Sequence, residues 1–149
     1  MSELNGEHRN LIDGELVAAS NGETFDNINP ATEEVIGQTA DGTREDMERA
    51  VASARRAFDE TEWSTDHGFR KRCLEQLNAA LKEAREELRQ IVIAEAGSPI
   101  LITYQVQVDN YIDAMPYWSD LASSFEYESR MSNVDFMGKS QGRMMRREP

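Results

Sequence analysis

The chain has 149 residues, which is enough for one domain. Its formal net charge of −12 argues against a nucleic acid or an anionic membrane as a partner. A single cysteine excludes an intrachain disulfide, the amino terminus has no apolar signal region, and no aliphatic run is long enough to cross a bilayer, so we expect a cytoplasmic chain.

Two short β-hairpins are predicted near the amino terminus, after polar residues 1–7, which we expect to be disordered. The Asp13-Gly14 pair stands between apolar residues, a pattern typical of a type I′ turn because both central residues need a positive φ. Farther on, strands over Thr24–Ile28 and Val35–Gln38 flank a turn at Pro30, whose fixed φ and missing N–H end the first strand.

Helices are predicted from residue 43 onward. Thr43 is a suitable N-cap, and the apolar residues of 47–58 recur at the spacing of a one-sided helix. Thr65 or Asp66 caps a second helical stretch, which continues over residues 85–96 after a kink. These segments predict a mostly helical middle of the chain.

A third helical region is predicted beyond Gly97, which suits the residue after a helix end. Ser98 can cap the next helix, and Pro99 fits its first turn. We expect one helix from about residue 100 to 123, bent at Pro116 because proline removes an internal hydrogen bond.

The helical period ends at Phe125. We predict two extended segments, residues 125–131 and 142–147, joined by a loose turn. Residues 130–149 carry five Lys/Arg against two Asp/Glu, the reverse of the charge balance of the whole chain. Such a tail either docks onto another acidic surface or is a frayed terminus with ordinary charge scatter.

Few residues suggest chemistry. No dinucleotide-binding, phosphate-loop, nucleophile-elbow or zinc-protease motif occurs. Cys73 has basic neighbours that could activate a thiol, but it shares an apolar stripe with Phe69 and Leu77, so we expect a structural role. Glu95 lies in the last turn of its helix, where an acid is unfavourable; either a bound cation offsets this, or the side chain is simply solvated.

Five motifs stand in a characteristic order. They are Gly22-Glu23-Thr24-Phe25, the stretch Ile28 to Gly37, Arg55-Arg56-Ala57-Phe58, Glu95 to Pro99, and Arg146 to Pro149. Their order and gaps, from about His8 to Pro149, resemble the beginning of an aldehyde dehydrogenase.

The resemblance implies an α/β family fold, of which this portion is mostly α-helical with short N-terminal β-hairpins and a C-terminal β arm. Residues 8–124 would be the N-terminal part of the cofactor-binding domain, and residues 125–149 an arm that forms a homo-oligomer, a dimer or tetramer. The parent enzyme would oxidise an aldehyde to a carboxylic acid with NAD or NADP. Its nucleophilic cysteine, its glutamate base and its dinucleotide site would all lie beyond residue 149.

The resemblance also implies two sites. A monovalent cation, Na or K, would be held by Asn27, the carbonyl of Ile28, and Glu95, although family members often have Thr in place of Asn27. Val106 and Asn110 would line one wall of the substrate tunnel; the alternative is an ordinary core valine and an exposed asparagine. We expect no cofactor on this portion alone and no catalysis by it.

Two other functions remain open on the sequence. The chain could be a non-catalytic truncated relative that acts as a binding or assembly module. It could also be an unrelated acidic helical interaction protein with a basic adhesive tail.

Overall fold

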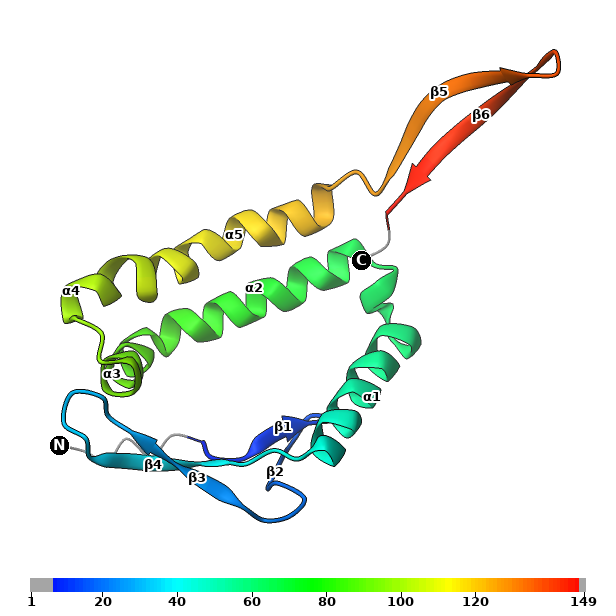
Figure 1. Cartoon of the computed structure of the whole chain (residues 1–149). Coiled ribbons are helices and arrows are strands. Elements are labelled where there is room, and N and C mark those ends of the chain that lie inside the picture. Colours follow the sequence, from blue (N-terminus) through cyan, green and yellow to red (C-terminus); the bar gives the residue numbers. More distant parts are fainter. Residues whose placement is uncertain (1–6, 148–149) are drawn as a thin grey trace.

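A computed structural model describes residues 7–147, and its helices lie between short hairpins at one end and a long hairpin at the other (Figure 1). The N-terminal strands are β1 (Asn10–Ile12), β2 (Glu15–Val17), β3 (Thr24–Ile28) and β4 (Val35–Ala40). The helices are α1 (Arg44–Glu60), the 3₁₀ turn η1 (Glu62–Ser64), α2 (His67–Glu83), α3 (Arg85–Ala96), α4 (Ile100–Ile102), the π-helical η2 (Thr103–Gln107) and α5 (Asp109–Ser124). The last strands are β5 (Glu128–Phe136) and β6 (Lys139–Arg146).

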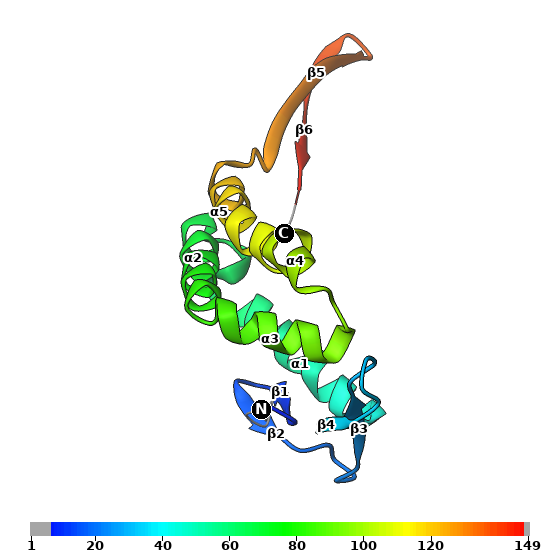
Figure 2. The same ribbon diagram turned by 90° about the vertical axis from the view of Figure 1, so that its left-hand side faces the viewer.

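The strands form three separate antiparallel pairs, β1–β2, β3–β4 and β5–β6. Helices α2 and α5 pack along each other in the middle of the molecule. The β5–β6 hairpin projects from one end of this helical pair, and the four N-terminal strands lie on the opposite side of the molecule, past α3 and α1 (Figure 2). The expectation of a mostly helical chain with short hairpins and a C-terminal β arm is therefore confirmed.

The N-terminal hairpins form where the turn residues allow them. Asp13 and Gly14 both have positive φ, 60° and 78°, as the predicted type I′ turn requires. In the second hairpin the register shifts between Asn27 and Ile28, and the β4 strand runs two residues past the predicted end, to Ala40. Of the stretch 1–7, for which disorder is predicted, only Glu7 is among the described residues, where it pairs with Arg9.

The start of α1 is held by a reciprocal cap. Thr43 accepts a hydrogen bond from the backbone N–H of Asp46, and the Asp46 carboxylate accepts from the backbone N–H groups of Thr43 and Ser20 at 2.9 and 3.0 Å. These backbone donors lower the pKa of Asp46 to about 2. The Thr43 cap is thus confirmed, and Asp46 also ties the loop after β2 to α1.

The prediction of one continuous helix over residues 100–123 is wrong, because the helix is interrupted before α5. Gln105 is non-helical, with φ −132° and ψ −110°, and α5 begins only at Asp109. Arg89 on α3, 1% exposed, donates to Thr103 Oγ1 at 3.1 Å and Asp109 Oδ1 at 2.8 Å across this break. The spacing of apolar residues could not predict this break, because it carries no information about a buried arginine that bridges two segments.

Pro116 does not interrupt α5, which continues to Ser124. A proline frees the carbonyl four residues before it, here that of Ile112. The side-chain amide of Asn78 on α2, which is buried, donates to this carbonyl at 2.6 Å. Helix α2 therefore replaces the hydrogen bond that the proline removes.

The prediction that Gly97 follows the end of a helix is confirmed, whereas the prediction that Ser98 caps the next helix is wrong. Gly97 has φ 62°, as expected after a helix end, and a Cβ there would lie 3.0 Å from Pro30 Cγ. Ser98 does not cap the next helix; it is buried, and Pro99 occupies the N-cap without a side-chain hydrogen bond. The close approach of Gly97 and Pro30 joins α3 to the β3–β4 turn.

The arm is longer and tighter than predicted. Its strands extend over 128–136 and 139–146, and the turn is only Met137-Gly138, with φ 51° and 76°. A register shift between Met131 and Val134 lets the two strands pair along most of their length. Every side chain from 130 to 147 is exposed. Because neither face of these strands is buried, the sequence has no alternation of apolar and polar residues from which their bounds could be predicted.

Replacing Asn78 by Ala should destabilise the chain by about 1–3 kcal/mol, because the buried Ile112 carbonyl would lose its partner. Pro116→Ala restores a backbone N–H that can bond this carbonyl within α5. The cost of Asn78→Ala should therefore be smaller by about 1 kcal/mol in the Pro116→Ala background. Urea unfolding of the four proteins measures this coupling. Equal costs in both backgrounds would contradict the account, and the exposed Gln76→Ala is the control.

Substituting Ala for Gly97 should cost about 1–2 kcal/mol, since the residue has a positive φ and the new methyl would press on Pro30. Gly42→Ala is the matched control, because its Cβ would meet only Asn10 atoms at 3.6 and 3.9 Å. The urea midpoints should separate the two variants. A Gly97→Ala chain as stable as Gly42→Ala would show that the contact contributes nothing.

Candidate functional site

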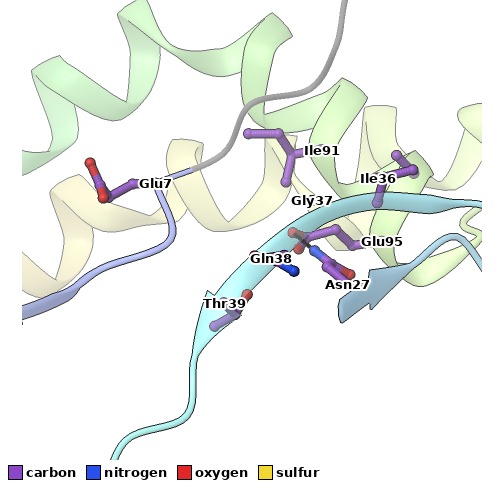
Figure 3. A pocket seen from close by; sticks show the side chains of 9 residues that line it. Glu7, Asn27, Ile36, Gly37, Gln38, Thr39, Ile91 and Glu95 are labelled. Atoms are coloured by element: carbon purple, nitrogen blue, oxygen red, sulfur yellow. Dashed lines mark hydrogen bonds between the residues drawn. The ribbon is translucent and has the colours of Figure 1, made fainter. Parts of the chain in front are cut away.

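Two of the three residues predicted to hold a cation meet in the structure. Asn27 on β3 donates from Nδ2 to Glu95 Oε1 on α3 at 2.5 Å. Figure 3 shows the two side chains pointing toward each other, with Gln38 beside them. The contact joins residues 68 positions apart, so it depends on how the β3–β4 hairpin sits against the end of α3.

Asn27 and Glu95 line a small cavity of about 40 Å³. It is lined by Glu7, Asn27, Ile36, Gly37, Gln38, Thr39, Ile91, Ala94 and Glu95. Ile28 is not among these residues; its side chain is exposed, and the register of the hairpin shifts between Asn27 and Ile28. The structure thus brings Asn27 and Glu95 together at a cavity that Ile28 does not line.

The cavity has the size and the donor atoms for one small ion or water. A volume of about 40 Å³ exceeds the 10–15 Å³ that a single water needs. The available groups are a carboxylate, side-chain amides and a hydroxyl, which suit hard cations. Within residues 7–147 no group of three His, Cys, Asp or Glu side chains could hold a metal.

The two carboxylates that line the cavity, Glu7 and Glu95, have different partners. Glu7 is paired with Arg9 at 2.8 Å, and this hydrogen bond lowers the pKa of Glu7 to about 2. Glu95 is exposed, and its hydrogen-bond partner among residues 7–147 is the neutral Asn27 amide. For Asn27 to ligate a cation its amide must turn, so that oxygen replaces nitrogen, and at such sites the two orientations are assigned from hydrogen bonding.

Sequence reasoning missed Glu7, Gln38 and Thr39 as cavity residues. The signal for two of them lay in the hairpin register, because Asn27 pairs with Gly37 and residues 38 and 39 follow directly on the same strand. No pattern in the sequence pointed to Glu7. Its place at the cavity depends on the path of the chain before β1.

Val106 and Asn110, the predicted tunnel residues, are both exposed. They do not lie on one continuous helix, because Val106 belongs to η2 and Asn110 to α5, with Val108 at φ −132° and ψ −64° between them. The spacing of four residues therefore does not place them one helical turn apart. Cys73 is half-buried on α2.

A family model described as "Aldehyde dehydrogenase family" matches residues 16–149. "Aldehyde dehydrogenase 1" of Tanacetum cinerariifolium is 31% identical over 127 residues, which are 85% of this chain and 26% of that protein. "Benzaldehyde dehydrogenase, mitochondrial" of Antirrhinum majus is 31% identical over 113 residues, 75% of this chain and 21% of that protein.

Solved structures give the same result. The crystal structure of betaine aldehyde dehydrogenase from Staphylococcus aureus in complex with NAD+ superposes with a TM-score of 0.77 at 34% identity, covering 83% of this chain and 24% of that one. The chain thus spans about a quarter of the length of the proteins it matches. No helix within residues 7–147 is both long and apolar enough to span a membrane.

Proposed function

The chain belongs to the aldehyde dehydrogenase family, and we propose that it serves as the N-terminal part of an NAD(P)-dependent enzyme that oxidises an aldehyde to a carboxylic acid. The observation that carries this proposal is the match over residues 16–149, which falls on a quarter of each relative. The reading of the sequence as an unrelated acidic helical protein is wrong, because the family match covers nearly the whole chain.

The helical layer supports this role because one of its faces is apolar and open. A groove of about 400 Å³ runs between α2, α3 and α5, and Tyr111 and Trp118 beside it are 69% and 59% exposed. Side chains of this kind are usually buried. The groove is lined by Leu81, Leu88, Val92, Gln107, Val108, Tyr111, Ile112, Met115 and Trp118. In the proposed enzyme this face packs against other parts of the cofactor-binding domain.

We assign no catalytic step to residues 1–149. The family reaction needs a thiolate that attacks the aldehyde, a nicotinamide that accepts the hydride, and a base that assists hydrolysis of the thioester. Cys73 is half-buried on α2, a position that suits packing better than nucleophilic attack. Val106 and Asn110 would contribute one wall of the substrate passage, and both are accessible for this.

The arm is the part of the chain proposed to form the homo-oligomer, as a dimer or tetramer. Strands β5 and β6 pair only with each other within the described residues, so each has one unpaired edge. Met137 and Phe136 at its tip are 87% and 60% exposed. An exposed apolar hairpin with open edges favours pairing with another subunit.

A second candidate function is that of an assembly module without catalysis, which joins intact subunits through residues 125–149. The same projecting hairpin supports it. Formation of mixed oligomers between this chain and an intact family member would favour the module. Failure to form them would favour a part that works only within its own enzyme.

The 149-residue chain alone should not reduce NAD in the presence of a short aldehyde, because it carries none of the groups proposed for the reaction. The measurement is the rise of nicotinamide absorbance under conditions where an intact family member turns over. Clear turnover by the chain, lost in a Cys73→Ala variant, would overturn the proposal.

We further propose that Asn27 and Glu95 hold a monovalent cation, Na or K. Either ion should then stabilise the chain relative to choline at equal ionic strength, by on the order of 1 kcal/mol at tenfold excess over its Kd. Glu95→Gln should abolish this difference, because among the described residues Glu95 is the carboxylate of the cavity that has no basic partner. Glu87→Gln, an exposed glutamate on the same helix, is the matched control. A difference that persists in Glu95→Gln would place the cation elsewhere.

A further inference from the structure

The break between α4 and α5 has a hydrogen bond with π-helical spacing. The backbone N–H of Val108 donates to the carbonyl of Thr103, five residues earlier, where an α-helix pairs residues four apart. Gln105 and Val108 have non-helical backbone angles, with φ of −132° at both. One extra residue in a helix turns the side chains on its two sides relative to each other by about 100°.

The break has no cause among its own backbone-breaking residues. Residues 100–115 contain neither glycine nor proline, and Pro116 lies later, within α5. A proline affects the carbonyl four residues before it, here that of Ile112, which also belongs to α5. Interruptions that lack both residue types occur where a side chain enters the hydrogen-bond ladder of the helix.

Thr103 is a side chain that does so. Its hydroxyl donates to the carbonyl of Ile100 at 2.6 Å, and its backbone N–H donates to the same carbonyl. In a continuous α-helix this carbonyl would accept from the backbone N–H of Tyr104. The hydroxyl therefore occupies the acceptor that the next helical hydrogen bond needs.

Arg89 reaches this hydroxyl from α3 and contacts both sides of the break. Its Nη1 donates to Thr103 Oγ1 at 3.1 Å, and its Nη2 donates to Oδ1 of Asp109, the first residue of α5, at 2.8 Å. The guanidinium carbon lies 3.8 Å from the centroid of the Tyr104 ring. Glu86, on the same helix as Arg89, accepts from this guanidinium at 3.1 Å. Arg89 and Thr103 are 1% and 0% exposed, so these contacts are shielded from water.

The hydrogen bonds run in one direction and leave a partner for Asp109 if Arg89 is replaced. A guanidinium only donates, whereas a hydroxyl both accepts and donates, so Thr103 accepts from Arg89 and donates to Ile100. Asp109 Oδ1 also lies 3.7 Å from Nη1 of Arg85. Removing Arg89 would thus release the Thr103 hydroxyl while the Asp109 carboxylate keeps a cation beside it.

We propose that Arg89 is a positioning residue: it holds Thr103 and Asp109 in the arrangement that interrupts the helix, and without it residues 100–124 form one continuous helix. The spacing of apolar residues over 100–123 favours such a helix. The contacts of Arg89 come from another element, α3, so they can override this local preference.

The consequence for the substrate passage rests on the proposed function. Val106 and Asn110 lie on either side of Val108, which is non-helical. In a continuous helix these two residues, four apart, would stand on one face. Arg89 would therefore set the relative position of the two side chains proposed for the passage wall.

The test is NMR of the full 149-residue chain labelled with 15N and 13C. In the parent chain the amide nitrogen of Val108 should show scalar coupling to the carbonyl of Thr103, and the 13Cα shifts of Gln105 and Val108 should not be helical. In Arg89→Met the coupling should move to the carbonyl of Tyr104, and both 13Cα shifts should become helical. Urea unfolding of the same samples measures overall stability, and a loss of stability alone would not move the coupling from one carbonyl to another.

Two further sets of variants make the test specific. Arg85→Met is the matched control, because Arg85 is also on α3 but contacts Asp109 and Asp113, both on α5, so the break should persist. Thr103→Ser keeps the hydroxyl and should keep the break. Thr103→Val removes the hydroxyl at similar size and should close the break with Arg89 still present.

A parent-like break in Arg89→Met would overturn the role of Arg89, and so would closure of the break in Arg85→Met. If Arg89→Met does not fold, Thr103→Val decides in its place, and a break that persists there overturns the role. The NMR signals need no turnover, so these outcomes leave the proposed function in place. A break that closes as expected, in a chain that does not bind the remainder of a family member, would keep the role of Arg89 and overturn the proposed function.

Discussion

The packing of α2 on α5 is the interaction on which the rest of this structure depends. It requires α5 to continue through Pro116, and this is possible because Asn78 of α2 supplies a hydrogen bond to the carbonyl that the proline leaves unpaired. The bond is buried, so it has no competition from water. One polar contact thus joins α2 to α5.

Two parts of the molecule with different side-chain contacts lie on either side of the helices. At one end, the close approach of Gly97 and Pro30 brings the β3–β4 hairpin against α3, and Asn27 reaches Glu95 as a result. At the other end, His67 and Arg70 of α2 hold Tyr127 at the root of the arm. The proposed cation site is therefore positioned by β3 and α3, and the root of the proposed assembly arm by α2, and neither needs a catalytic group.

Much of the fold was accessible from local signals in the sequence. The Asp13-Gly14 turn, the Thr43 cap and Gly97 were predicted because each depends on the conformational preference of one or two residues. The break before α5 was missed because it depends on Arg89, whose partners come from another segment. The length of the arm was missed because strands with no buried face show no alternation. For the candidate site, the resemblance to the family implied that Asn27 and Glu95 lie together, and the cavity also includes residues that the tertiary arrangement brings there.

We propose that this chain is the scaffold part of an aldehyde dehydrogenase and that its open apolar face packs against the remainder of that enzyme. The most direct measurement is reconstitution with the Staphylococcus aureus betaine aldehyde dehydrogenase from which the matching N-terminal quarter has been deleted. Co-expression should yield a complex in which backbone amides around Tyr111 and Trp118 become protected from hydrogen exchange. The claim would be contradicted if that remainder recovered its own N-terminal quarter under the same conditions but did not bind this chain.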